Sequence, residues 1–114
     1  MKKILISGVL VCMLFMTAAC SGKPSKPEGM LDSTYKAAIK TMETVEDYKD
    51  EKITANEAYF ILMDQVGRLE SRGDSDDGYD VQDAIEDIEK MFGKKSVNME
   101  KIEDNYNTIK DILN

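Results

Sequence analysis

Apolar residues recur every three or four positions in four separate segments of this 114-residue chain. That spacing collects them on one side of an α-helix and leaves the charged residues between them on the other side. The segments span about residues 33–48, 54–72, 78–92 and 96–113, with connections of about four to six residues. Short connections favour antiparallel neighbours. The sequence therefore predicts an all-α fold, a small antiparallel bundle of three or four helices over residues 31–114.

Residues that start and stop helices lie at the edges of these segments. Asp32 or Ser33 is placed to cap the first one. In the second, Thr54-Ala55-Asn56-Glu57 fits a capping box, where the Thr hydroxyl and the Glu carboxylate bind free N–H groups. The remaining boundary signals are two expected terminators, Gly73 and Gly93, and an expected N-cap, Ser96.

The second segment is apolar on more than one side, because Phe60, Ile61 and Met63 lie beside its main stripe. We therefore expect this helix to be central in the bundle. Phe60, Met63 and Gly67 share one line of it and form the candidate partner-binding surface, a groove for a helix or peptide. The alternative is internal packing: the fourth or first segment covers this line, and Gly67 allows a close approach.

The first twenty residues have the pattern of an export signal. Lys2 and Lys3 precede an apolar run of about 13 residues, Ile4–Met16, which is shorter than the roughly 20 needed to span a membrane. Small residues follow, ending in Ala18-Ala19-Cys20.

This end resembles the signal peptide of bacterial lipoproteins. Ala18, Ala19 and Cys20 match the lipobox, and Thr17 stands where leucine is usual. The resemblance covers residues 1–20 and implies cleavage of residues 1–19, a diacylglyceryl thioether on Cys20, and often a further acyl chain such as palmitate on the new amine. Two or more chains anchor a protein stably. We therefore expect it on the extracytoplasmic face of the cell membrane; the alternative is an ordinary secretory signal with an incidental cysteine.

A tether is expected between the lipid and the bundle. Residues 20–30 contain both prolines of the chain, and residues 21–29 reach about 30 Å when extended. Lys23 and Lys26 either attract anionic headgroups, by about 1 kcal/mol each, or belong to a solvated spacer with no electrostatic role.

Charge and composition exclude several functions. Of the 15 basic residues, Lys2 and Lys3 leave with the signal, so 13 face 22 acids and the net charge is −9. Such a chain repels nucleic acid. Histidine, the commonest general base and metal ligand, is absent. We expect no enzyme activity, no cofactor and no metal centre.

Acidic residues crowd the region 74–87, and calcium binds clustered oxygen ligands. An EF-hand register with Gly78 at loop position 6 places Ala84 where a bidentate acid is required, so that motif fails. Helix capping and a solvated face explain these acids more simply. The sequence thus favours a membrane-anchored, non-enzymatic interaction module with an envelope protein as partner. A calcium or small-ligand binder using residues 74–87 is the alternative.

Overall fold

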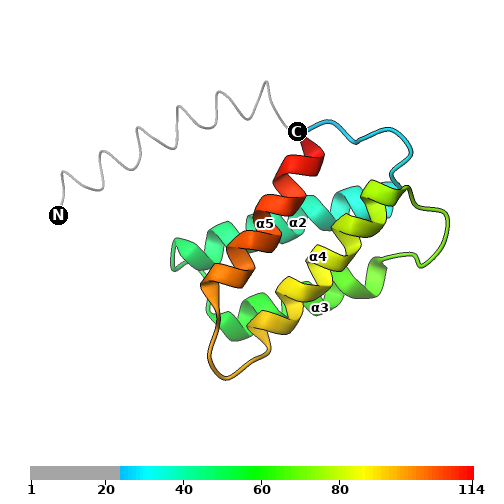
Figure 1. Ribbon diagram of the computed structural model, residues 1–114. Helices are drawn as coiled ribbons and strands as arrows, with labels where there is room; N and C mark the ends of the chain where they lie inside the picture. Colours follow the sequence, from blue (N-terminus) through cyan, green and yellow to red (C-terminus); the bar gives the residue numbers. More distant parts are fainter. Residues whose placement is uncertain (1–23) are drawn as a thin grey trace.

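The computed structural model describes residues 24–114, and this part of the chain contains four helices and no strand (Figure 1). The helices are α2 (Asp32–Lys49), α3 (Ala55–Arg68), α4 (Asp76–Phe92) and α5 (Met99–Leu113). The predicted all-α bundle is confirmed, in its four-helix form. The expected signal peptide over residues 1–19, the lipidation residue Cys20 and the basic residue Lys23 lie outside the described residues. None of the helices described has the length and apolar content that crossing a membrane requires.

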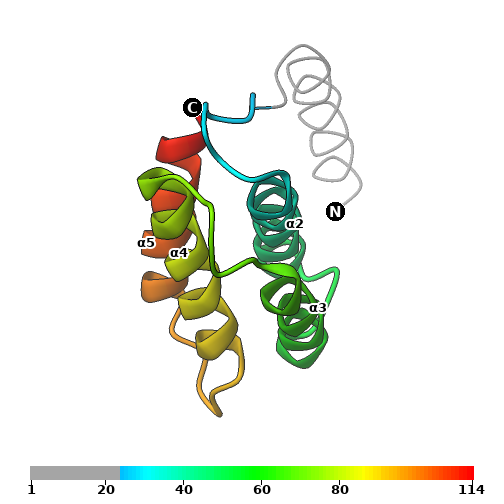
Figure 2. The ribbon, with the colours of Figure 1, turned by 90° about the vertical axis from the view of Figure 1, so that its right-hand side faces the viewer.

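The helices form two layers, the α2–α3 hairpin and the α4–α5 hairpin (Figure 2). Successive helices run in opposite directions (Figure 1), and two polar contacts agree with this order by placing α2 antiparallel to α3 and to α5. Ser33, at the start of α2, donates a hydrogen bond of 2.8 Å to Glu70, which follows the end of α3. Tyr106 of α5 donates one of 2.6 Å to Glu46 near the end of α2. The bundle is therefore up-and-down.

Two of the helices are central and two lie at opposite edges. α2 and α4 each contact the other three helices, whereas no contact joins α3 to α5 within the described chain. The expectation that α3 is central was wrong. Its extra apolar residues Phe60 and Met63 point away from the core, because no fifth helix exists in the described residues to cover them.

The core is built from large side chains of three helices packed against small ones of α2. The buried residues of α2 are alanine, threonine and valine, so α2 allows three other helices to approach closely. Burying each large aliphatic side chain stabilises the fold by about 1.5–3 kcal/mol. The large aliphatic residues with no exposed surface are Leu62, Ile85, Ile88, Ile102 and Ile109.

The N-terminal edge of the folded unit lies slightly before the expected boundary at residue 31. Met30 is only 2% exposed and belongs to the core. Before it, the Tyr35 hydroxyl donates a hydrogen bond to the carbonyl of Pro24, and Lys26 forms an ion pair of 2.8 Å with Asp32. Part of the segment assigned to the tether is thus attached to the bundle.

Helix boundaries follow local hydrogen bonds. The predicted capping box is confirmed: Thr54 Oγ1 accepts from the Glu57 N–H at 3.1 Å, and the Glu57 carboxylate accepts from the Thr54 N–H at 2.8 Å. Gly93 follows α4 as expected. The N-cap of α5 is Asn98, not Ser96, because the Asn98 side chain accepts from the Lys101 N–H.

The expected terminator Gly73 was wrong for α3, which ends five residues earlier at Arg68. The next residue, Leu69, adopts an extended conformation and packs against the core while half-buried. Where the chain leaves the helix, the Glu70 carbonyl accepts a hydrogen bond from Gln82 Nε2 at 2.9 Å and the Glu70 carboxylate accepts one from Ser33. Gly73 lies in the following loop.

Candidate functional site

The outer face of α3 carries the candidate partner-binding residues Phe60, Met63 and Gly67, hereafter the α3 outer face. Phe60 is 60% exposed and Met63 is 44% exposed, and these are the two large apolar side chains exposed to this degree in residues 24–114. A Cβ atom built on Gly67 would meet nothing within 4 Å. The alternative of internal packing against this line is therefore wrong.

The helical repeat explains why this face is exposed. Ala58, Leu62 and Gln65 point from the opposite side of α3 into the bundle and are buried. Phe60, Met63 and Gly67 follow at steps of three and four on the outside, so they form one continuous line. A well-packed inner side fixes the helix, and the outer line is held in place on a rigid support.

Phe60 is also steadied by its neighbour. The Tyr59 ring packs over Gly93, where a Cβ atom would lie 2.7 Å from the ring, and is itself half-buried. The centroids of the Tyr59 and Phe60 rings are 6.0 Å apart in a tilted arrangement, within the range of favourable aromatic pairs. Phe60 is thus an aromatic side chain beside a fixed ring, a suitable anchor for a contact.

Charged residues line one flank of the α3 outer face. Arg68 Nε lies 3.0 Å from the Asp64 carboxylate, one turn earlier, and both side chains are largely exposed. Glu57 lies at the other end of the same flank. A shallow groove of about 540 Å³ separates this flank from α2, lined by Ser33, Lys36, Ala37, Asp64, Gln65 and Arg68. Sequence reasoning did not identify this groove, because it depends on the distance between two helices.

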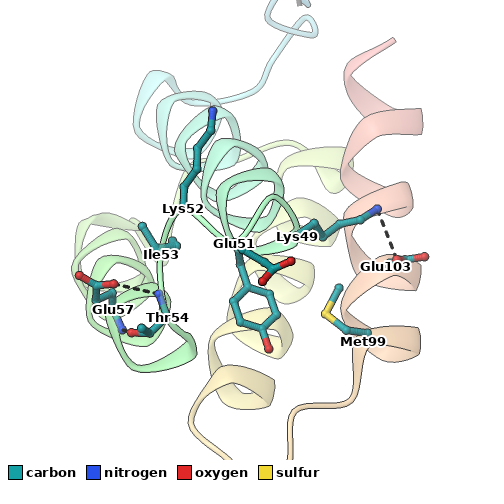
Figure 3. Close-up of a pocket in the computed structure, with 9 residues that line it drawn as sticks. Lys49, Glu51, Lys52, Ile53, Thr54, Glu57, Met99 and Glu103 are labelled. Atoms are coloured by element: carbon teal, nitrogen blue, oxygen red, sulfur yellow. Dashed lines mark hydrogen bonds and ion pairs between the residues drawn. The ribbon is translucent and has the colours of Figure 1, made fainter. Parts of the chain in front are cut away.

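A second hollow, of about 620 Å³, lies where the α2–α3 turn meets α5 (Figure 3). Apolar groups from Tyr48, Ile53 and Met99 contribute to its lining. Its charged groups are largely engaged: Lys49 pairs with Glu103 at 3.4 Å, and Glu57 belongs to the capping box. It is wide open and shows no converging set of unpaired polar groups, so we do not assign a ligand to it.

Glu51, on the rim of this hollow, closes α2. Its φ of 61° is in the left-handed region, where glycine is usual. The Lys52 N–H bonds to the Asp47 carbonyl at 2.8 Å, which is the long hydrogen bond of a Schellman motif. The strained conformation is thus explained by helix termination.

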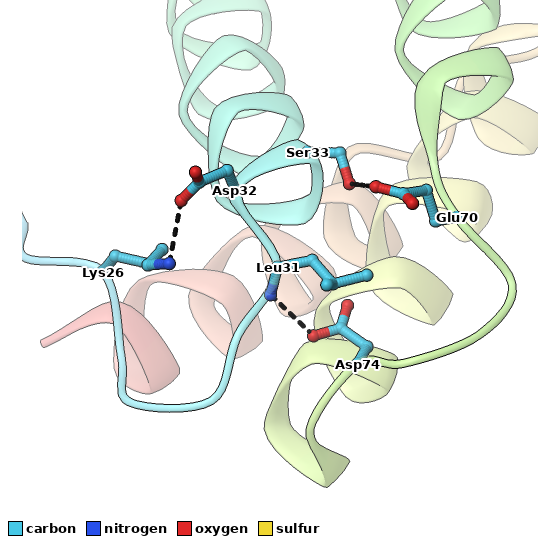
Figure 4. A network of polar contacts seen from close by, with 6 residues as sticks. All are labelled: Lys26, Leu31, Asp32, Ser33, Glu70 and Asp74. Carbon is cyan, nitrogen blue, oxygen red and sulfur yellow. Dashed lines mark hydrogen bonds and ion pairs between the residues drawn. The ribbon is translucent and has the colours of Figure 1, made fainter.

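Asp74, the first acid of the region 74–87, is held by hydrogen bonds within the fold (Figure 4). Asp74 Oδ1 accepts from the Leu31 N–H at 3.0 Å and from the Ser75 N–H at 2.9 Å. Asp74 Oδ2 accepts from the Thr34 hydroxyl and from Gln82 Nε2, the latter at 2.8 Å. Asp74 therefore caps α2 from across the bundle, and neither Asp32 nor Ser33 does so.

Hydrogen bonding sets the ionisation of Asp74. Partial burial by itself raises the pKa of this carboxyl, but the hydrogen bonds from Thr34, Leu31, Gln82 and Ser75 together lower the pKa below its ordinary value. The ionised form is the one the fold requires. In residues 24–114, no three acidic or thiol side chains come together in a way that would hold a metal ion.

Two other groups have shifted pKa values for structural reasons. Lys26 donates to Asp32 and lowers the pKa of that exposed carboxyl. Burial, together with the hydrogen bond to Glu46, raises the pKa of Tyr106 well above its ordinary value. Both pairs join neighbouring parts of the fold.

Comparison with known proteins adds no relatives. The chain matches no protein family, no curated protein and no solved structure.

Proposed function

We propose that this protein is a lipid-anchored, non-enzymatic interaction module on the extracytoplasmic face of a bacterial membrane. The α3 outer face makes the contact with a protein partner in the envelope. The observation that carries this proposal is the exposure of Phe60 and Met63 side by side on a well-packed helix. Aromatic and methionine side chains are enriched at protein interfaces relative to the rest of the protein surface.

The lipoprotein-like residues 1–20 support the membrane part of the proposal. With lipid on Cys20, only residues 21–23 separate the anchor from Pro24, which is bonded to Tyr35 of the bundle. Three extended residues reach about 10 Å, so the bundle stays closer to the membrane than a free tether of nine residues would allow. Confinement to this thin layer raises the effective concentration of the module towards envelope partners.

Lys26 is better explained as part of the fold than as a headgroup contact, because it pairs with Asp32. The attachment is therefore expected to depend on the lipid. In a bacterial host, the wild-type chain should sediment with membranes, and Cys20→Ser should not. Equal membrane association of both would contradict the lipid anchor.

The contact surface is tested separately in the same cells. A photo-crosslinking residue at position 63 should yield a defined crosslinked protein, and the same residue at the exposed Asn107 of α5 should not, since α5 does not contact α3. Crosslinking at neither position, or equally at both, would contradict the assignment of the surface.

The calcium alternative finds little support. Asp74, the first acid of the region, has both its oxygens engaged by donors of the fold, and no three acids within residues 24–114 come together in a way that would hold a metal ion. A thermal melt with and without millimolar calcium should show no shift; an increase in the melting temperature would favour a binding role for residues 74–87.

A further inference from the structure

Gly67 makes no close approach to another part of the described chain that would require a glycine. It is exposed, it lies in the last turn of α3, and a Cβ atom there would touch nothing within 4 Å. Glycine in a helix is destabilising relative to alanine because it loses more conformational freedom. The missing side chain leaves a shallow seat on the α3 outer face, one heptad from the exposed ring of Phe60.

We propose that α3 pairs with α3 of a second copy in an antiparallel arrangement, with Phe60 of each copy seated over Gly67 of the other. Seven residues, about 10.5 Å along the helix, separate ring and seat. A two-fold axis between Met63 and Asp64 makes both Phe60–Gly67 contacts at once, as a self-complementary interface requires. This inference deepens the proposed function and rests on it, since it names the partner of the α3 outer face.

Charge complementarity favours this arrangement over a parallel one. Glu57 and Arg68 lie at opposite ends of the same flank. An antiparallel pairing brings Arg68 of each copy to Glu57 of the other on one side of the interface, whereas a parallel pairing places these flanks on opposite sides and forms no such pair. Asp64 of the two copies approach each other beside the axis, and each is paired with Arg68 of its own chain at 3.0 Å. Along the helix, the position midway between Glu57 and Arg68 lies one residue, about 1.5 Å, from the position midway between Phe60 and Gly67. A single two-fold symmetry axis can therefore produce both the charged and the apolar contacts.

The area of contact sets the expected strength. A helix of 14 residues is about 21 Å long and about 10 Å wide, so its face covers about 200 Å². A stable interface buries about 800 Å² on each partner. The pairing is therefore weak in dilute solution and depends on the high local concentration that a shared membrane provides.

Disulfide crosslinking in membranes tests the pairing with the full chain. Residues 21–114 contain no cysteine, so single cysteines introduced at exposed positions report only on their own neighbours. Oxidised membranes should give a disulfide dimer for Met63→Cys, which lies next to the axis. Phe60→Cys and Gly67→Cys should each give little dimer alone and a strong one when expressed together. Asn107→Cys on α5 is the matched control and should give none.

A second substitution tests the seat itself. Gly67→Leu in the Met63→Cys background places a side chain in the open space at position 67, where an added Cβ meets nothing within 4 Å. It should reduce the dimer roughly tenfold. An unchanged yield would overturn the proposed contact. Thermal melts confirm that each variant folds.

The outcomes separate the inference from the proposed function. Strong dimers from Phe60→Cys alone would indicate a parallel pairing and overturn the antiparallel one. No Met63→Cys dimer, with a photo-crosslink from position 63 to a different protein, would overturn the self-pairing and leave the proposed function intact. No crosslink of either kind would overturn both.

Discussion

Removing the Asp74 carboxylate should destabilise the bundle more than removing any exposed acid. Asp74→Ala deletes four hydrogen bonds and leaves the Leu31 N–H at the start of α2 without its partner. Hydrogen bonds to a charged group contribute about 1.5–3 kcal/mol each, but they are not additive, and solvent screens this half-buried site. Gln82 also keeps its bond of 2.9 Å to the Glu70 carbonyl. We therefore expect a total loss of about 2–4 kcal/mol.

Urea unfolding followed by circular dichroism at pH 7 measures this loss of stability. In a thermal melt, the Asp74→Ala variant of a domain of this size should unfold at least about 8 °C below wild type. Asp83→Ala, an exposed change in the middle of α4, is the matched control and should stay within about 0.5 kcal/mol of wild type. The wild-type advantage is complete above the ordinary pKa of an aspartate, because the pKa of Asp74 is lowered in the folded state. It should disappear as the pH falls through that lowered value.

Asp74→Asn separates charge from volume. The new amide group would meet the Gln82 amide donors in place of an acceptor oxygen, so most of the loss at pH 7 should remain. A loss below about 1 kcal/mol for Asp74→Ala, or a difference from wild type that does not change with acidification, would refute the capping role.

Three further predictions concern other parts of the fold. Gly78→Ala should lower the melting temperature, because the new Cβ would lie 1.8 Å from Asp74 Oδ1. The same change should be harmless or stabilising when Asp74 is already alanine, and additive effects in a double-mutant cycle would contradict this. Glu51→Gly should stabilise by about 0.5–1 kcal/mol in urea unfolding, since φ is 61°, and a loss of stability would contradict the strain argument. In an ultraviolet titration, one of the five tyrosines should ionise at a higher pH than the others, because the pKa of Tyr106 is raised. Tyr106→Phe should abolish that late component. It should also lower the free energy of unfolding by about 1 kcal/mol, because the hydrogen bond to Glu46 is lost. Because the folded-state pKa of Tyr106 is the higher one, its contribution to stability should be lost as the pH rises above 10, and a late component that survives in Tyr106→Phe would refute the assignment.

Much of the fold follows from local patterns in the sequence. The four helices, their order and the capping box at Thr54 depend on residues within one or two turns of each other, which is where helical periodicity and capping rules apply. The end of α3 was missed because Glu70 is held by hydrogen bonds from Ser33 and Gln82, which are distant in the sequence, so no local rule places the end before Gly73.

The candidate site was only partly predictable for the same reason. Periodicity places Phe60, Met63 and Gly67 on one line, but whether another helix covers that line depends on which helices are neighbours. The cap of α2 by Asp74 joins residues 43 positions apart, so no local rule finds it. The acids of region 74–87 suggested a cation site, whereas Asp74, the first of them, receives N–H and O–H donors of the protein.

The most direct measurement is the intact mass and N-terminal fragmentation of the protein extracted from bacterial membranes. The chain should begin at Cys20 and carry the added mass of a diacylglyceryl group, with a further acyl chain on the amine in hosts that attach one. The Cys20→Ser variant should lack this mass. A free thiol on Cys20, or a chain that retains residues 1–19, would contradict the account of an anchored interaction module.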